Sequence, residues 1–146
     1  MAHKDTVQDD ELKRILSGND IYWNLTASVG YACKNRTADV MLVQFFLNHM
    51  YLGDYEEWVK VDGRFGGKTW AAIKEFQRSY SCVIDGAVRP ADGKRLHTPK
   101  QGKIYTIYQL NSVVAQHYPP PVFKDIRVIK GIPGALSIEV GTVAAI

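Results

Sequence analysis

The chain has 146 residues, a formal net charge of +3 and 46% hydrophobic residues. This length allows one ordinary domain with a sizeable core, and the composition is that of a globular protein without low-complexity segments. The basic residues are scattered and form no dense cluster, which argues against nucleic-acid binding. No apolar run approaches the ~20 residues of a membrane helix, and the polar, acidic start lacks the apolar stretch of a secretory signal. We therefore expect no membrane span and a cytoplasmic protein as synthesised, exported to the periplasm or cell wall only by a non-classical route.

The first 30 residues predict a short helix followed by an irregular segment. Thr6, with Asp9 three residues later, is typical of a helix-capping pattern. The apolar residues expected on this helix are Val7, Leu12, Ile15 and Leu16. Residues 21–30 show no clear period, and we interpret the aromatic pair Tyr22 and Trp23 as packing against the core.

Two further helices are predicted in the middle of the chain. Thr37 or Asp39 can cap the first, whose apolar residues recur three and four positions apart until Gly53 ends it. The second is expected over residues 67–80, with an apolar stripe on one face and Thr69 as its cap.

The last third of the chain predicts one more helix and then a change of period. Thr98 followed by Pro99 favours a helix start, and this helix must stop before the three prolines at 119–121. Residues 122–129 are rich in β-branched side chains, and a turn follows. Leu136, Ile138 and Val140 then alternate with polar residues. This alternation is typical of a β-hairpin.

Cys33 and Cys82 are the only two cysteines in the sequence. They are far apart and form no C-x-x-C pair, so they predict neither a zinc site nor a redox motif. Cys82 precedes Val83 and Ile84 in an apolar stretch, which favours a small buried side chain. We expect free thiols rather than a disulfide, although the sequence alone leaves pairing of the two open.

Two short loops are built around Asp-Gly pairs, at Asp62 and at Asp85. Glycine adopts positive φ at low cost, and aspartate accepts hydrogen bonds from nearby backbone amides, so both pairs predict tight turns. Residues 63–69 also resemble the end of a phosphate-binding loop, but no glycine stands where the first one is required, and we reject nucleotide binding. We assign Phe65 to packing between two helices.

Four linked segments resemble the peptidoglycan-binding-domain family, a small three-helix module often attached to cell-wall hydrolases. They are a Val-Gln-x-x-Leu-Asn helix, a Val-Asp-Gly-x-Phe-Gly loop, a Thr-x-x-Ala-Ile-x-x-Phe-Gln helix and a second Asp-Gly turn. The matching positions are Val43, Gln44, Leu47, Asn48, Val61, Asp62, Gly63, Phe65, Gly66, Thr69, Ala72, Ile73, Phe76, Gln77, Asp85 and Gly86. The resemblance spans about residues 37–90.

Together, the patterns and the resemblance predict a mainly α fold. We expect a compact three-helix bundle of the peptidoglycan-binding type, with extra N- and C-terminal helices and a C-terminal β-hairpin. Three parts are expected. Residues 1–30 form an N-terminal helix and an irregular segment, residues 31–118 form the peptidoglycan-binding-like helical domain, and residues 119–146 form a proline spacer and hairpin tail.

The resemblance implies a non-catalytic module that binds peptidoglycan or a muropeptide and needs no cofactor or metal. The four histidines show no metal-ligand spacing, and no Gly-x-Ser-x-Gly motif is present. Aromatic rings stack on sugars and arginine binds carboxylates. The candidate ligand-binding residues are therefore Tyr51, Tyr55, Trp58, Asp62, Arg64 and Trp70. Whether peptide or glycan is recognised stays open.

Two hypotheses about the wider role follow. The absence of a secretory signal favours delivery to the wall by a phage or a contractile secretion system. The alternative is a structural or adaptor protein that uses the same scaffold for protein–protein interaction, with the C-terminal hairpin as the pairing edge for its partner.

Overall fold

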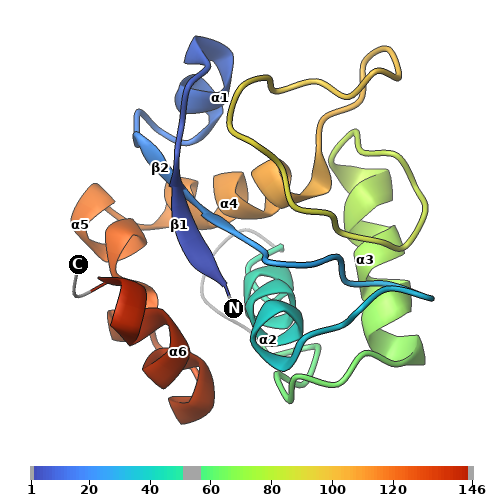
Figure 1. Ribbon diagram of the computed structural model, residues 1–146, viewed down its shortest axis with the longest axis vertical. Coiled ribbons are helices and arrows are strands. Elements are labelled where there is room, and N and C mark those ends of the chain that lie inside the picture. Colours follow the sequence, from blue (N-terminus) through green and yellow to red (C-terminus); the bar gives the residue numbers. More distant parts are fainter. Residues whose placement is uncertain (1, 51–56, 145–146) are drawn as a thin grey trace.

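The computed structural model describes residues 2–50 and 57–144, with side chains described up to residue 140. The protein is mainly helical, as expected, and carries one two-stranded antiparallel sheet (Figure 1). The strands are β1 (His3–Thr6) and β2 (Ile21–Asn24). The helices are α1 (Asp10–Ile15), α2 (Thr37–Leu47), α3 (Gly67–Ser79), α4 (Thr106–His117), α5 (Pro120–Lys124), the 3₁₀ helix η1 (Ile126–Val128) and α6 (Gly134–Ala144).

The sheet lies at the N-terminus, where the sequence predicted only a helix and an irregular segment. β1 and β2 pair from His3 opposite Asn24 to Thr6 opposite Ile21. Helix α1 lies between the two strands in the sequence. The two aromatic residues of β2 are fully buried, which confirms that they pack in the core. Thr6 ends β1 and does not cap a helix, so that prediction was wrong.

Helix α1 is capped by Asp9, whose Oδ2 accepts a hydrogen bond from the Leu12 N–H at 2.9 Å. The carboxylate satisfies one of the unpaired N–H groups of the first turn, as an N-cap residue should. Leu12 and Leu16 are buried, so this short helix is held by packing as well as by its cap.

Helix α2 lies at the centre of the molecule, between α3 and α6 (Figure 1). Every residue from Ala38 to Leu47 is buried, so this helix has no solvent-facing stripe. The expected capping by Thr37 or Asp39 was wrong, because Thr37 is the first helical residue. The Asp39 carboxylate instead accepts hydrogen bonds from the N–H groups of Thr26 and Ala27 at 3.0 and 3.1 Å. It therefore ties the preceding loop to the helix.

Helix α4 begins at Thr106, eight residues later than the Thr98-Pro99 pair predicted. The Thr98 hydroxyl instead closes a local turn, accepting from the Lys100 N–H at 3.2 Å and donating to the Lys100 carbonyl at 3.1 Å. Gly102 has φ +74°, a left-handed conformation that stops a right-handed helix from running through this segment. The turn formed by Thr98 and the conformation of Gly102 therefore prevent the helix start that the Thr98-Pro99 pair predicted.

The expected C-terminal β-hairpin was wrong. Residues 120–144 form α5, η1 and α6, and α6 packs against α2 and β1. Leu136 and Val140, four residues apart, are fully buried, whereas Ile138 between them is 76% exposed. In a helix, positions i and i+4 share one face and position i+2 does not, so helical packing accounts for the pattern that looked like strand alternation.

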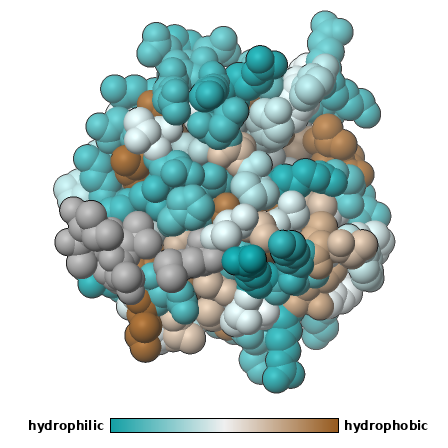
Figure 2. All heavy atoms as spheres, in the orientation of Figure 1, coloured by the Kyte–Doolittle hydropathy of each residue, from teal (hydrophilic) through white to brown (hydrophobic). Residues whose placement is uncertain are grey.

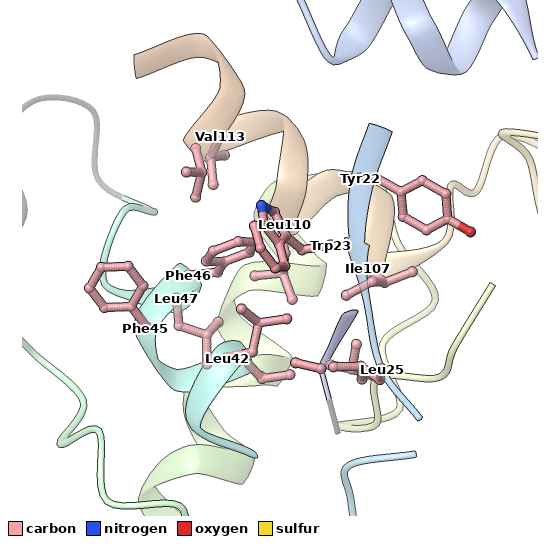
Figure 3. Close-up of a cluster of buried hydrophobic side chains, with 14 of the residues drawn as sticks. Tyr22, Trp23, Leu25, Leu42, Phe45, Phe46, Leu47, Ile107, Leu110 and Val113 are labelled. Atoms are coloured by element: carbon pink, nitrogen blue, oxygen red, sulfur yellow. The ribbon is translucent and has the colours of Figure 1, made fainter. Parts of the chain in front are cut away.

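A single hydrophobic core connects these elements. Figure 3 shows side chains of β2, α2 and α4 converging, among them Trp23, Leu42 and Leu110. The Trp23 indole also donates a hydrogen bond to the Phe123 carbonyl at 2.8 Å, which attaches the C-terminal helices to the sheet. The division of the chain into three parts stays a prediction. Figure 2 shows mostly hydrophilic residues on one face, with strongly hydrophobic ones in separate patches.

Both cysteines are free thiols, and Cys82 is fully buried, as expected from its apolar neighbours. Burial disfavours the thiolate and raises the pKa of Cys82 to about 11. In the parts of the chain that the structure describes, no helix is both long enough and apolar enough to cross a membrane.

Candidate functional site

The first Asp-Gly loop is held in place by the buried Gln44 of α2. The Gln44 Oε1 accepts hydrogen bonds from the N–H groups of Asp62 and Gly63 at 3.0 and 2.9 Å. The Gln44 Nε2 lies 3.1 Å from three acceptors, which are Asp62 Oδ1, the Arg64 carbonyl and Thr69 Oγ1. One amide therefore joins α2, the loop and the first turn of α3. Thr69 was expected to cap α3, but Gly66 occupies the cap position and the Thr69 hydroxyl accepts from Gln44.

The second Asp-Gly loop repeats this arrangement with Gln77 of α3. The Gln77 Oε1 accepts from the N–H groups of Asp85 and Gly86 at 3.0 and 2.8 Å. Its Nε2 lies 3.1 Å from Asp85 Oδ1, 2.9 Å from the Ala87 carbonyl and 3.1 Å from Thr106 Oγ1 at the start of α4. The repeated Gln and Asp-Gly motifs of the sequence are therefore two copies of one structural clamp.

A groove of about 360 Å³ lies beside the first loop. Its lining residues are Gln44, Val59, Lys60, Asp62, Arg64, Phe65, Gly66, Gly67, Lys68 and Thr69. Three of these residues are cationic and one is anionic. The anion, Asp62, accepts a hydrogen bond from the Arg64 N–H at 2.9 Å, and this bond is the main reason that its pKa is lowered. With three cations against this one anion, the groove carries a net positive charge.

The three cations of the groove, Lys60, Arg64 and Lys68, are exposed. None of them makes an ion pair with another residue in the described ranges, 2–50 and 57–144. Cationic side chains on a rigid loop can bind carboxylates, and the arginine fork can do so through two parallel hydrogen bonds. The groove is therefore suited to an anionic ligand.

Trp58 precedes the lining residue Val59 in the sequence but does not itself line the groove. Its indole Nε1 donates to the Leu47 carbonyl at 2.9 Å, and its side chain is 37% exposed. The buried Asn48 fixes the segment by accepting from the N–H groups of Trp58 and Val59 at 3.2 and 2.9 Å. An exposed indole thus sits on a well-ordered backbone. Tyr51 and Tyr55, also expected to bind ligand, lie outside the described residues.

Trp70 does not line the groove. It projects from α3 toward Tyr31, and the two ring centroids are 5.4 Å apart. The Lys74 Nζ lies 4.1 Å from the centroid of the indole. The structure therefore brings Asp62 and Arg64 together in the groove, whereas neither Trp58 nor Trp70 lines it.

Sequence reasoning missed Lys60, Lys68 and Tyr31. The two lysines flank the loop in the sequence, so counting the charges around the Asp-Gly pair could have found them. Tyr31 carries no such signal, because it comes from a distant loop and meets the site only through the fold.

A larger depression, of about 660 Å³, lies beside the sheet and is lined in part by Asp5, Asn24, Asp92 and Arg95. The Asp5 carboxylate is already bound, since it accepts from Asn24 Nδ2 at 2.8 Å and lies 3.0 Å from the His3 ring. The residues that line this depression carry both negative and positive charges, so they favour no single class of ligand. Within the described residues, no group of three or more His, Cys, Asp or Glu side chains could hold a metal ion.

Comparison with known protein families agrees with this geometry. Residues 36–91 match the family model described as "Putative peptidoglycan binding domain". The match includes α2, α3 and both Asp-Gly loops, together with the glutamines that clamp them. No curated protein and no solved structure matches the chain. The match over residues 36–91 confirms the resemblance to the peptidoglycan-binding-domain family seen in the sequence.

Proposed function

We propose that the protein binds peptidoglycan through the groove beside the first Asp-Gly loop and does so without catalysing a reaction. The observation that carries the proposal is the set of three cations on a loop clamped by Gln44, within the segment that matches the family. Peptidoglycan stem peptides carry carboxylates, and cations presented on a fixed backbone bind them at a low ordering cost.

Arg64 has the central role in this proposal. Its backbone is fixed on both sides, because its N–H donates to Asp62 Oδ1 at 2.9 Å and its carbonyl accepts from Gln44 Nε2 at 3.1 Å. The guanidinium can then hold a carboxylate in two parallel hydrogen bonds. Lys60 and Lys68 add point charges on either side of the groove.

The aromatic residues have a secondary role. Trp58 has a partly exposed indole that is anchored to the Leu47 carbonyl and precedes the lining residue Val59, and it would cover an apolar part of a ligand that extends beyond the groove. Asp62 holds the shape of the loop and can accept from an amide of the peptide with the part of its carboxylate that faces solvent. Tyr51 and Tyr55 stay predictions as ligand-binding residues.

The strength of such binding follows from the exposure of the cations. Exposed ion pairs are worth ~0.2–1 kcal/mol each, and salt screens them over a Debye length of ~8 Å at physiological ionic strength. Three such contacts would add roughly 1–3 kcal/mol to the free energy from buried apolar area, so we expect binding that weakens clearly between low and high salt.

Co-sedimentation with washed peptidoglycan sacculi tests the proposal. The wild-type protein should bind saturably, and Arg64→Ala should weaken binding about three- to fivefold, equivalent to about 1 kcal/mol. Lys100→Ala is the matched control, because Lys100 is also an exposed cation but does not line the groove. No sedimentation of the wild type would refute binding. Equal effects of the two substitutions would refute the location.

The adaptor alternative has lost its expected pairing edge, because α5, η1 and α6 occupy the place of the C-terminal hairpin, and it stays a prediction without support from the comparisons. Delivery by a phage or contractile secretion system, and the route to the periplasm or wall, stay predictions without support from the comparisons.

A further inference from the structure

One exposed aromatic ring stands beside the groove and is held from two sides. Tyr31 is 64% exposed, yet its ring centroid lies 5.4 Å from that of Phe65 and 5.4 Å from that of Trp70. The Tyr31 and Phe65 rings meet edge to face, at 86°, which is a favoured geometry for aromatic pairs. We call these three residues the aromatic cluster. The two ring contacts restrict the rotation of the exposed Tyr31 side chain.

The backbone that presents Tyr31 is also fixed. Asn35 closes the loop by donating from Nδ2 to the Gly30 carbonyl at 2.9 Å and accepting at Oδ1 from the Gly30 N–H at 2.8 Å. Ala32 and Asn35 have φ values of 59° and 50°, and for alanine this left-handed conformation costs free energy. The loop therefore presents an exposed aromatic ring on a backbone that is strained at Ala32.

Trp70 acts as the support of this ring. The Lys74 Nζ lies 4.1 Å from the Trp70 ring centroid, so a cation already occupies part of the indole surface. At Gly86, a Cβ atom would lie 2.4 Å from the indole Nε1, so only glycine leaves room for the tryptophan in this position. Trp70 is therefore enclosed between α3 and the second Asp-Gly loop, and Tyr31 is the ring left open to a ligand.

We propose that Tyr31 stacks on a pyranose ring of the peptidoglycan glycan while the groove holds the stem peptide, an inference that rests on the proposed function. The C–H groups on one face of a pyranose form an apolar surface with partial positive charge, which complements the negative face of an aromatic ring. A depression of about 490 Å³ on the same loop is lined in part by Thr26, Ser28, Lys34 and Arg36. Tyr31 does not line this depression, so its polar side chains would bind hydroxyl and acetamido groups of the glycan beyond the stacked sugar.

The size of the exposed surface favours a sugar over a protein partner. One tyrosine ring offers at most ~150–250 Å² for burial, whereas a stable protein interface buries ~800 Å² on each partner. The loop beside it is cationic, with Lys34 and Arg36 both exposed, rather than apolar. Phe65 belongs both to the aromatic cluster and to the groove, so one ligand can reach both surfaces. Tyr31 lies outside residues 36–91, so the family match does not include it.

Three substitutions at Tyr31 test the inference. Tyr31→Phe keeps the flat ring, Tyr31→Leu keeps apolar volume without the ring, and Tyr31→Ala removes both. Ile84→Ala is the control, because Ile84 is an exposed apolar residue outside the cluster, 45% exposed. Two ligands are titrated: soluble oligomers of N-acetylglucosamine, followed by tryptophan fluorescence, and sacculi, followed by co-sedimentation. Urea midpoints of all variants confirm that each is folded.

We expect Tyr31→Phe and Ile84→Ala to bind both ligands as the wild type does, within about twofold. Tyr31→Leu and Tyr31→Ala should bind both about three- to tenfold more weakly, the range of one aromatic contact. Arg64→Ala should weaken binding to sacculi but not to the sugar oligomers, because its ligand is the peptide.

Several results would overturn the inference. If the wild type binds sacculi and Tyr31→Ala binds them equally well, the glycan does not stack on Tyr31, and the proposed function survives. The same conclusion follows if Tyr31→Leu binds like Tyr31→Phe. A dimer that Tyr31→Ala abolishes would assign the ring to a second copy of the chain. Failure of the wild type to bind sacculi at all would overturn both proposals.

Discussion

Gln44 provides the strongest test of how the fold positions the groove. The side chain is 1% exposed and makes all its hydrogen bonds to the first Asp-Gly loop and to Thr69. In Gln44→Ala, the Asp62 N–H and the Arg64 carbonyl can turn to water, because both residues are exposed. The Gly63 N–H cannot, because Gly63 is buried, and an unsatisfied buried donor costs ~1–3 kcal/mol.

Removal of the buried γ-methylene group of Gln44 adds ~1 kcal/mol. The free energy of unfolding should therefore fall by about 3 kcal/mol, and the Tm of a chain of this size by about 6–12 °C. Urea and thermal denaturation, followed by circular dichroism, measure both quantities. Gln116→Ala is the matched control, since Gln116 is exposed and makes one hydrogen bond, to Ser112 Oγ at 2.8 Å. It should change the free energy by ~0.5 kcal/mol or less.

Gln44→Glu tests the donor role of the Gln44 amide separately from its acceptor role. The volume is kept, but an oxygen replaces the Nε2 that faces Asp62 Oδ1, the Arg64 carbonyl and Thr69 Oγ1. Repulsion between oxygens should make this variant unstable at pH 7 and should ease below pH 5, where the new carboxyl binds a proton. If Gln44→Ala loses less than ~1 kcal/mol, or behaves like Gln116→Ala, the clamp does not hold the loop and the reasoning is wrong.

Three further predictions follow from the same structure. Gly86→Ala should lower the Tm and shift tryptophan fluorescence, because its Cβ would overlap Trp70, whereas Gly67→Ala, in open space, should raise helix stability slightly. Burial lowers the pKa of His49 to about 4, so between pH 6.5 and 4 the unfolded chain binds a proton that the folded one does not. From pH 7 to pH 5 the wild type should lose ~2 kcal/mol more than His49→Phe by urea denaturation, and equal losses would contradict this. Leu136→Ala should cost ~2–4 kcal/mol, since α6 is part of the core, and a value near zero would mean that α6 is detachable.

The sequence predicted the two helices that carry the family motif because their signals are local. The apolar spacing in residues 37–47 and 67–79 and the Asp-Gly turns that follow each helix depend on neighbouring residues alone. The C-terminal helix could not be found in this way. Leu136, Ile138 and Val140 fit a period of two as well as a contact between positions i and i+4, and only packing against α2 and β1 selects the helix.

The N-terminal sheet was missed for a related reason. Its strands are four residues long and are separated by α1, so no tight turn marks the pairing. Asn111 of α4 helps to hold β2 in place. Its side chain accepts a hydrogen bond from the Trp23 N–H at 2.7 Å and donates one to the Trp23 carbonyl at 2.8 Å. This contact joins residues 88 positions apart, and no local pattern predicts it.

The candidate site also contains residues that a local motif predicts and residues that only the fold brings together. Asp62 and Arg64 could be proposed from the sequence, because the Asp-Gly loop that carries them is a local motif. The two ring contacts that Tyr31 makes, with Phe65 and with Trp70, join two loops and a helix, so only the folded chain shows that this ring is both supported and exposed.

The most direct test of peptidoglycan binding at this groove is an amide NMR titration of the ¹⁵N-labelled protein with soluble muropeptides. Saturable shifts should concentrate on residues 59–69, with a second group around Tyr31 when the muropeptide carries its sugars. Arg64→Ala should reduce the shifts of the first group under the same conditions. Shifts confined to the depression near Asp5 and Arg95, or no shifts at millimolar ligand, would contradict the proposed site.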